Sequence, residues 1–339
     1  MPSEMQTLIA NLSRMQIDDF FRENADVTRA ECDQWATQAV GRPVCASPVQ
    51  GVTSYTVVPV DRVDGDTGIV IQFRSAEYAF DLEFLQYVQV AYGSRFVPRH
   101  RDSGTLGGLH AYMMDDVGGV AVYLARDQLR AHGGCLLSNT LEDFAKFFAA
   151  AWHNTPSPMA TPDRDEKYTS YKADLVQLHQ GLPERFHKML DRLLQALPTL
   201  FVDDWPMVPN HTDLLENNIH VDPKTGHITG ICDWKDATVS PFGTSLEGLE
   251  SLLGERTTTG WRWICNSAEL RRGFWSAFAA AMGSSALCEI ARIDAARLVG
   301  IFLKYGLVWV DAENREPVAE GSSGLGYLEA VTLELQGNG

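Results

Sequence analysis

The stretch that decides the fold runs from residue 210 to residue 243 and reads NHTDLLENNIHVDPKTGHITGICDWKDATVSPFG. Two short β-prone runs, 218–221 and 228–232, flank the sequence Asp-Pro-Lys-Thr-Gly at 222–226. Proline fixes φ in such a segment and glycine supplies a positive φ, which together favour a tight turn. The stretch therefore predicts a β-hairpin inside a longer polar segment.

Four polar residues surround this predicted hairpin: His211, Asp213, Asn218 and Asp233. A turn centred near Thr225–Gly226 would place Asn218 opposite Asp233, and directly paired residues lie about 4.5–5.5 Å apart. One amide oxygen and one carboxylate would then converge on a point, which suits Mg²⁺, a cation that keeps phosphate and water as its other ligands. We therefore predict Asn218 and Asp233 as metal ligands, with Asp213 placed to meet a substrate hydroxyl.

This arrangement resembles the catalytic loop and metal hairpin of the protein-kinase-like fold, in which one Asp accepts the hydroxyl proton. The motif Asp233-Trp234-Lys235 resembles the corresponding motif of the aminoglycoside phosphotransferase and choline kinase superfamily. Within that superfamily it is most similar to a small-molecule phosphotransferase-like branch common in fungi. The resemblance implies that Asp213 is catalytic and that His211 braces the loop backbone. It also implies ATP and Mg²⁺ as cofactors and the hydroxyl group of a small molecule as the phosphoryl acceptor.

Three positions depart from the family pattern. Thr212 replaces the usual glycine, Lys235 replaces the usual acid, and Gln72 stands where a strand cation normally grips phosphate. None of these changes removes a metal ligand. They leave two alternatives open, because a fold does not fix a function: a catalytically silent ligand-binding pseudokinase, and a kinase fold repurposed for a non-phosphoryl reaction in natural-product metabolism.

The composition is that of a soluble globular protein, with 45% hydrophobic and 21% charged residues among 339. The net charge of −16 argues against nucleic acid or an anionic membrane as partner, since both reward clusters of Lys and Arg. It suits a cationic small molecule, or simply an acidic surface. No signal peptide or membrane-length apolar run is apparent, so we expect a cytoplasmic protein. The oligomeric state is left open.

The N-terminal part is predicted to be rich in strands. Expected elements are helices over 4–22, 28–41 and 76–91, two strands joined by a glycine turn over 44–59, and strands over 69–74 and 109–114. Thr28 and Glu31 predict a capping box at the start of the second helix, and Gly41 before Pro43 predicts its end. The resemblance implies a nucleotide-covering loop with Gly51 and Ser54 in it. The two-residue period of a strand places Gln72 and Arg74 on one face of the third strand, where Arg74 either substitutes for the cation usual in the family or is a solvated strand end. Glu83 would be the partner of that cation.

The connection between the two parts follows the strand at 109–114. The resemblance implies that backbone groups from Met113 to Asp116, including those of Met114, pair with adenine. We predict an α+β, bilobal, protein-kinase-like fold, with an N-terminal lobe over 1–117 and a mainly helical lobe over 118–339.

The second lobe is expected to be helical apart from the hairpin. Its predicted helices cover 140–153, 184–196, 245–253, 267–282 and 285–307, and a polar loop is expected over 155–170. Trp261 and Trp263, between two of the helices, either line a substrate pocket or belong to the core.

Overall fold

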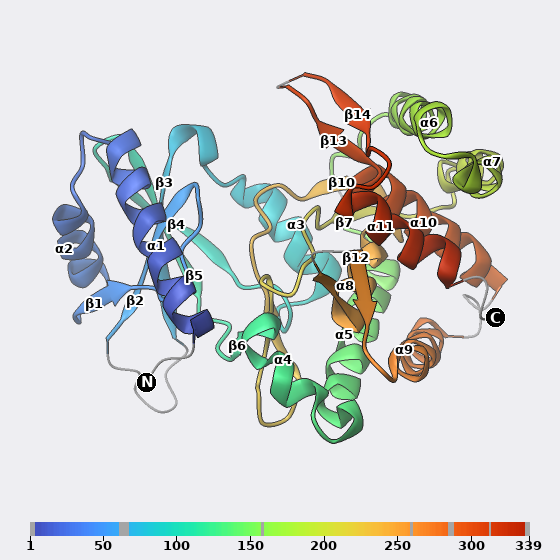
Figure 1. The fold of residues 1–339 in the computed structure, drawn as a ribbon. Helices are drawn as coiled ribbons and strands as arrows, with labels where there is room; N and C mark the ends of the chain where they lie inside the picture. The colour runs from blue at the N-terminus through green and yellow to red at the C-terminus, as the bar shows by residue number, and fades with distance from the viewer. Residues whose placement is uncertain are drawn as a thin grey trace. The chain divides into compact units, whose positions relative to one another are not determined.

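The computed structural model describes residues 4–60, 68–156, 159–257, 260–283, 288–311 and 313–335 (Figure 1). The chain forms two compact units: Met1–Gln89 with Val97–Gly118, and Val90–Phe96 with Gly119–Gly339. The predicted boundary after residue 117 lies one residue from this division. However, the segment Val90–Phe96, expected in the first lobe, belongs to the second unit. The physical reason is Tyr92, which is buried there, stacks on Phe147 and donates to the Pro209 carbonyl.

The first unit is built on a five-stranded antiparallel sheet with the order β1-β2-β3-β5-β4. Its strands are β1 (Val44–Ala46), β2 (Ser54–Pro59), β3 (Ile69–Ser75), β4 (His100–Leu106) and β5 (Leu109–Asp115). The helices are α1 (Glu4–Glu23), α2 (Arg29–Val40) and α3 (Leu82–Tyr92), the last of which continues into the second unit. The predicted capping box at Thr28 and Glu31 is present, and Gly41 ends α2 in the left-handed conformation.

The core of the first unit lies between α1, α2 and one face of the sheet. Its buried members from the helices include Phe20, Cys32 and Ala36, and those from the strands include Tyr55 and Phe73. Within this layer the Tyr55 and Phe73 rings stack, with 6.3 Å between their centroids.

The second unit is mainly helical. Its helices are α4 (Val122–Arg130), α5 (Cys135–His153), α6 (Arg164–Gly181), α7 (His187–Ala196), α8 (Leu249–Leu253), α9 (Ser267–Met282), α10 (Ile290–Tyr305) and α11 (Ser323–Glu329). Its strands are β6 (Val120–Ala121), β7 (Met207–Asn210), β8 (Ile219–Val221), β9 (Ile228–Ile231), β10 (Thr238–Pro241), β11 (Gly254–Thr257), β12 (Gly260–Trp263), β13 (Leu307–Trp309) and β14 (Arg315–Pro317). The short sheets pair as β6-β8-β9, β7-β10, β11-β12 and β13-β14.

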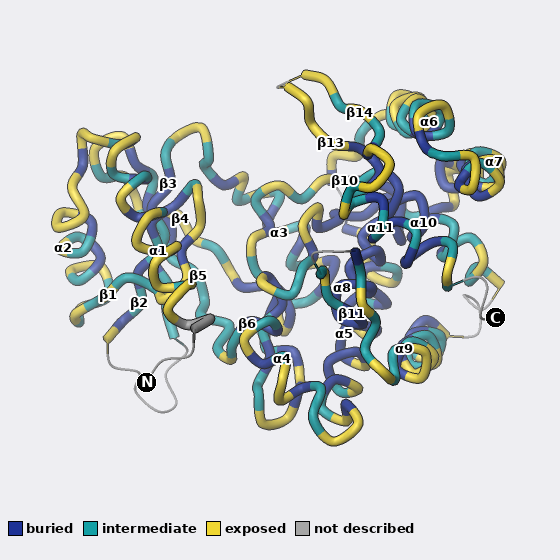
Figure 2. The backbone as a smooth tube through the Cα atoms, viewed as in Figure 1, coloured by how far each residue is buried: buried dark blue, intermediate teal, exposed yellow. Residues whose placement is uncertain are grey.

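The deepest part of this unit surrounds α8. Every residue from Thr244 to Leu253 is buried, and Figure 2 shows the buried backbone around α8 and α5. The predicted α+β class is confirmed, with most helices in the second unit and the large sheet in the first. Within the described residues, no helix is long and apolar enough to cross a membrane.

Several predicted boundaries are wrong. Helix α5 begins at Cys135, not at Thr140, because Thr140 is a buried mid-helix residue whose hydroxyl donates to the Gly226 carbonyl. The expected loop over 155–170 contains the start of α6, whose N-cap Asp163 accepts from two backbone N–H groups. The expected helix over 76–91 is a 3₁₀ turn, Ala76–Tyr78, followed by α3. The strands β4, β6, β7 and β10–β14 were not predicted. Residues 285–287, the start of the last predicted helix, lie outside the described residues.

Candidate active site

The candidate catalytic loop begins where β7 ends, and Asn210 holds its base. The side chain of Asn210 is buried, and its Nδ2 donates to the Ser240 carbonyl at 3.0 Å. Its Oδ1 accepts from the Ser245 hydroxyl at 2.7 Å and from the Ser245 backbone N–H at 3.2 Å. Because β7 also pairs with β10, the two ends of the 210–243 stretch are fixed to each other.

The hairpin β8–β9 forms as predicted, but its predicted register is wrong by one residue. Ile219 pairs with Ile231, and the Cys232 N–H donates to the Asn218 carbonyl at 2.8 Å. Asn218 is therefore opposite Cys232, and Asp233 follows one residue later. The cause is the turn, which closes between Asp222 and His227 and is followed by an irregularity in the β8–β9 pairing.

Gly226 fits this turn on two counts. Its φ of +74° lies in the left-handed region, as predicted from the turn sequence. A Cβ atom at this position would also lie 2.0 Å from the Leu136 carbonyl oxygen in α5, so any side chain would force the hairpin away from the helix.

His211 ties the catalytic loop to the hairpin. Its Nε2 lies 2.8 Å from the Cys232 carbonyl oxygen, and its Nδ1 accepts from the Asp213 N–H at 3.1 Å. These two contacts require a neutral ring with the proton on Nε2. Burial lowers the pKa of His211, and this outweighs the opposing effects of the Cys232 hydrogen bond and of the Asp233 and Asp213 charges. His211 therefore braces the backbone in a neutral form.

Asp213 and Asn218 lie together beside this brace. The Asn218 Nδ2 donates to the Asp213 backbone carbonyl at 2.7 Å and lies 3.4 Å from its Oδ2. The Asp213 side chain is 52% exposed, whereas Asn218 is buried. The arrangement presents a carboxylate to solvent at the end of a rigid loop.

Asp233 has a φ of +62°, one of two non-glycine residues in the described part of the chain with a positive φ. This conformation is uncommon outside glycine, although aspartate tolerates it better than most residues. It interrupts the alternation of side chains that an extended strand would impose after β9. Such backbone strain is typical of functional positions.

Asn218 and Asp233 fit a Mg²⁺ site of the kind that relies on phosphate and water for its remaining ligands. The donor set is one amide oxygen and one carboxylate, on residues held close by the Cys232–Asn218 hydrogen bond. No cluster of three or more His, Cys, Asp or Glu side chains suited to a metal occurs among the described residues.

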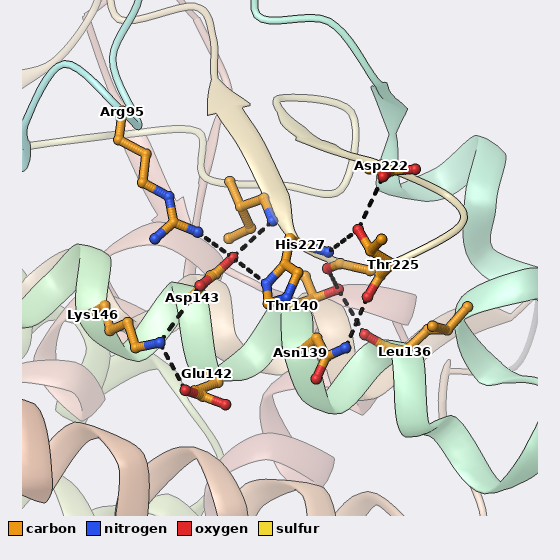
Figure 3. A network of polar contacts seen from close by, with 12 residues as sticks. Arg95, Leu136, Asn139, Thr140, Glu142, Asp143, Lys146, Asp222, Thr225 and His227 are labelled. Atoms are coloured by element: carbon orange, nitrogen blue, oxygen red, sulfur yellow. Dashed lines mark hydrogen bonds and ion pairs between the residues drawn. The ribbon is translucent and has the colours of Figure 1, made fainter.

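A buried carboxylate, Asp143 of α5, anchors the other end of the hairpin (Figure 3). Its Oδ2 accepts from the Ile228 N–H at 3.1 Å and from Arg95 at 2.7 Å, and lies 2.9 Å from His227 Nδ1. The Asp143 side chain is only 1% exposed. The start of β9 is therefore fixed to α5 by a charge-assisted hydrogen bond.

Two charged residues near Asp213 were not predicted from the sequence. Lys304 of α10 places its Nζ 3.6 Å from Asp213 Oδ1 and 3.0 Å from Glu247 Oε1. Glu247 is buried, and burial raises the pKa of its carboxyl group, with Lys304 opposing the rise. The available signal was a single lysine within the apolar run GIFLKYGL at 300–307.

In the first unit, Gln72 and Arg74 lie on the same face of β3, as predicted. Arg74 Nε donates to Gln72 Oε1 at 2.7 Å, and Gln72 Nε2 donates to the hydroxyls of Ser54 and Thr56, each at 3.0 Å. The guanidinium carbon of Arg74 lies 4.3 Å from the centroid of the Phe80 ring. Arg74 is buried, which rules out the alternative of a solvated strand end.

The other predicted nucleotide residues show a mixed outcome. Gly51 lies against Ser54, whose Oγ would be 3.0 Å from an added Cβ. The prediction that Glu83 pairs with the strand cation is wrong, because Glu83 is exposed on α3 and accepts from the Tyr87 hydroxyl at 2.9 Å. This surface position keeps its carboxylate hydrated, with Tyr87 one helical turn away.

The expected adenine-pairing segment is already partly hydrogen-bonded. Met114 lies in β5 between β3 and β4, and the Asp116 N–H donates to the Gly68 carbonyl at 2.7 Å. The Asp115 N–H donates to the Arg99 carbonyl. An adenine contact in this segment would therefore use other backbone groups than these two N–H donors.

The two tryptophans lie on β12 of a hairpin rather than at a helix connection. Trp261 packs edge-on against Tyr327 at 4.7 Å and against Trp263 at 5.8 Å. Both side chains are half-buried. Trp261 covers part of α11 through its contact with Tyr327, which favours the core alternative for Trp261.

Comparison with known protein families supports the predicted family. The model of the phosphotransferase enzyme family matches residues 63–246, which is more than half of the chain. A search of curated protein sequences finds no significant match.

Solved structures show the same fold at low sequence identity. A choline/ethanolamine kinase family protein from Mesorhizobium loti is 13% identical, with 95% of this chain and 94% of that chain covered and a TM-score of 0.53. A provisionally assigned aminoglycoside phosphotransferase from Ralstonia eutropha is 14% identical, with 87% and 92% covered and a TM-score of 0.53. The chain therefore has the predicted kinase-like fold and belongs to the phosphotransferase enzyme family.

Proposed function

We propose that the protein is an ATP- and Mg²⁺-dependent O-phosphotransferase that acts on a hydroxyl group of a small molecule. The observation that carries the proposal is the joint placement of Asp213 and Asn218, whose side-chain nitrogen donates to the Asp213 carbonyl at 2.7 Å. This bond fixes an exposed carboxylate next to a buried amide at the end of the metal hairpin. The membership of the phosphotransferase family supports the same chemistry.

In the proposed reaction, Asp213 orients the acceptor hydroxyl and accepts its proton. The acceptor oxygen forms a bond to the γ-phosphorus while the bond to the β–γ bridging oxygen breaks, and the electron pair leaves with ADP. Asn218 and Asp233 would hold Mg²⁺, which neutralises charge on the phosphates when bound. Because phosphoryl transfer has a loose transition state, positioning and charge neutralisation supply most of the catalysis.

The rigid supports of the site fit this demand for positioning. His211 fixes the Asp213 backbone, Asn210 fixes the start of the loop, and Asp143 fixes the start of β9. All three side chains are buried and act through hydrogen bonds to the backbone. Buried hydrogen bonds of this kind restrict the positions of the reacting groups as narrowly as catalysis requires.

The test is conversion of candidate acceptors by the wild type and by Asp213→Asn, each with and without ATP and Mg²⁺. A positioned base contributes about 10²–10⁴-fold, so turnover should fall by at least about 10²-fold in the variant while MgATP binding persists. Asp236→Asn is the matched control, because Asp236 lies in the same stretch and its side chain is 76% exposed.

Two outcomes would overturn the proposal. Substrate conversion by the wild type without any nucleotide would indicate a non-phosphoryl reaction on the same scaffold. Tight MgATP binding with no transfer to any acceptor or to water would indicate a ligand-binding protein instead.

A further inference from the structure

Lys304 is a charged residue in the candidate active site that has no counterpart among the predicted site residues. It lies in α10 with Gly300, Ile301 and Phe302, all buried. Its side chain is 21% exposed, so the ammonium group reaches the edge of the core beside Asp213. The distance from Nζ to Asp213 Oδ1 is 3.6 Å, and that to Glu247 Oε1 is 3.0 Å.

The pairing with Glu247 fixes the position of this ammonium group. Glu247 is 3% exposed, and taking a carboxylate out of water costs more than an ion pair usually returns. A buried ion pair is therefore weak evidence for a contribution to stability, and its presence beside an exposed aspartate points to a functional reason. An ammonium group has three N–H donors, and Glu247 Oε1 takes one of them.

We infer that Lys304 is a catalytic cation that contacts the transferring phosphoryl group, an assignment that rests on the proposed function. Glu247 acts as its positioning residue. In the step, Asp213 takes the acceptor proton and loses its negative charge, while negative charge spreads over the phosphoryl oxygens. Lys304 stays protonated throughout. Its electrostatic interaction with Asp213 weakens as Asp213 becomes neutral, and its interaction with the phosphoryl oxygens strengthens. No further reactant is needed.

Charge considerations support a cation at this position. The strand position that would carry a phosphate-gripping cation holds Gln72, whose amide is engaged with Ser54, Thr56 and Arg74. A preorganised cation at the reacting oxygens stabilises the transition state more than the ground state. An ammonium group that α10 holds beside the proposed base meets this requirement.

The test uses MgADP with fluoroaluminate, a planar anion that mimics the transferring phosphoryl group, so no acceptor has to be known. Calorimetry gives the affinity for MgADP with and without fluoroaluminate. The variant is Lys304→Met combined with Glu247→Gln, which removes the cation without leaving a buried carboxylate unpaired. Glu247→Gln alone keeps the lysine, and Lys188→Met removes an exposed lysine of α7 as the matched control.

We expect fluoroaluminate to tighten MgADP binding in the wild type and in Lys188→Met. In the double variant, the ratio of the MgADP affinities with and without fluoroaluminate should be about 10- to 100-fold smaller than in the wild type, as expected for one lost hydrogen bond to a charged group. The affinity for MgADP alone should be unchanged. Lys304→Arg, which keeps a cation at this position, should retain part of the gain in affinity that the double variant loses. Full tightening in a folded double variant would overturn the inference and leave the proposed function standing. No tightening in the wild type would overturn both.

A second measurement needs no variant and covers the case in which the double variant does not fold. The wild type is acetylated with an amine reagent in the MgADP and MgADP–fluoroaluminate states, and lysine modification is followed by peptide mass spectrometry. Lys304 should be protected at least about tenfold by fluoroaluminate, whereas Lys188 should react equally in both states. Equal reactivity of Lys304 in the two states would refute the contact.

Discussion

Removal of the Asp143 carboxylate should loosen the β8–β9 hairpin at its anchored end. In Asp143→Ala, the buried Ile228 N–H loses its acceptor, and Arg95 and His227 lose their shared carboxylate (Figure 3). The variant therefore tests whether a helix outside the hairpin positions the residues of the site. Its effect can be worked out contact by contact.

The unsatisfied N–H of Ile228 should cost about 1–3 kcal/mol, because the group is buried and left without a partner. The Arg95, His227 and Lys146 side chains that pair with Asp143 are 53%, 50% and 46% exposed, so solvent screens these pairs and together they add about 1–2 kcal/mol. The total loss is about 2–5 kcal/mol. For a unit of this size, such a loss lowers the melting temperature by roughly 5–20 °C.

The assay is thermal unfolding of Asp143→Ala beside Glu142→Ala. Glu142 is the preceding residue of α5, is 52% exposed and pairs with Lys146, so its loss should cost no more than about 1 kcal/mol. The Asp143 variant should also bind MgATP more weakly when folded, because β9 leads directly to Asp233. Equal melting temperatures for the two variants would refute the assigned anchoring role.

Three further predictions concern single sites. Asp233→Ala should abolish Mg²⁺-dependent nucleotide binding in a folded protein, and unchanged calorimetric affinity would remove Asp233 from the metal site. Arg74→Ala should weaken ATP binding far more than Gln72→Ala, whereas small and equal effects would exclude β3 from phosphate binding. Burial lowers the pKa of His100 to about 4, so the unfolded chain binds more protons between pH 4 and about pH 6.5. The contribution of His100 to stability should be complete above that range and fall by as much as about 3 kcal/mol as the pH drops through it. His100→Asn should flatten this part of the stability profile, and an unchanged profile would contradict the pKa shift.

The sequence by itself determined the elements whose signals are local. The turn at 222–226 and its flanking β-prone runs predicted the hairpin, because proline and glycine restrict φ regardless of the surroundings. The capping box at Thr28 and the glycine at Gly41 predicted the ends of α2 for the same reason. The spacing of His211, Asp213 and Asn218, through its resemblance to the kinase-like pattern, predicted a catalytic loop before the hairpin.

Only the tertiary structure decided the features that depend on contacts between distant segments. The hairpin register shifted by one residue because the closing contact of the turn and an irregularity in the ladder jointly set the pairing. Helix α5 extends to Cys135 because its first turns pack against Gly226, some 90 residues later in the chain. The partner of Glu83 is Tyr87 because α3 turns this side chain to solvent.

The clearest example is Lys304, which lies 91 residues after Asp213 in the sequence and 3.6 Å from it in space. No local pattern relates the two, since their proximity follows from the packing of α10 against the buried segment Thr244–Gly248 that carries Glu247. A side-chain charge acts over a few ångströms, whereas a sequence motif records only distance along the chain. The sequence therefore predicted the proposed base and the proposed metal ligands, and the packing of the helices brought the proposed cation beside the base.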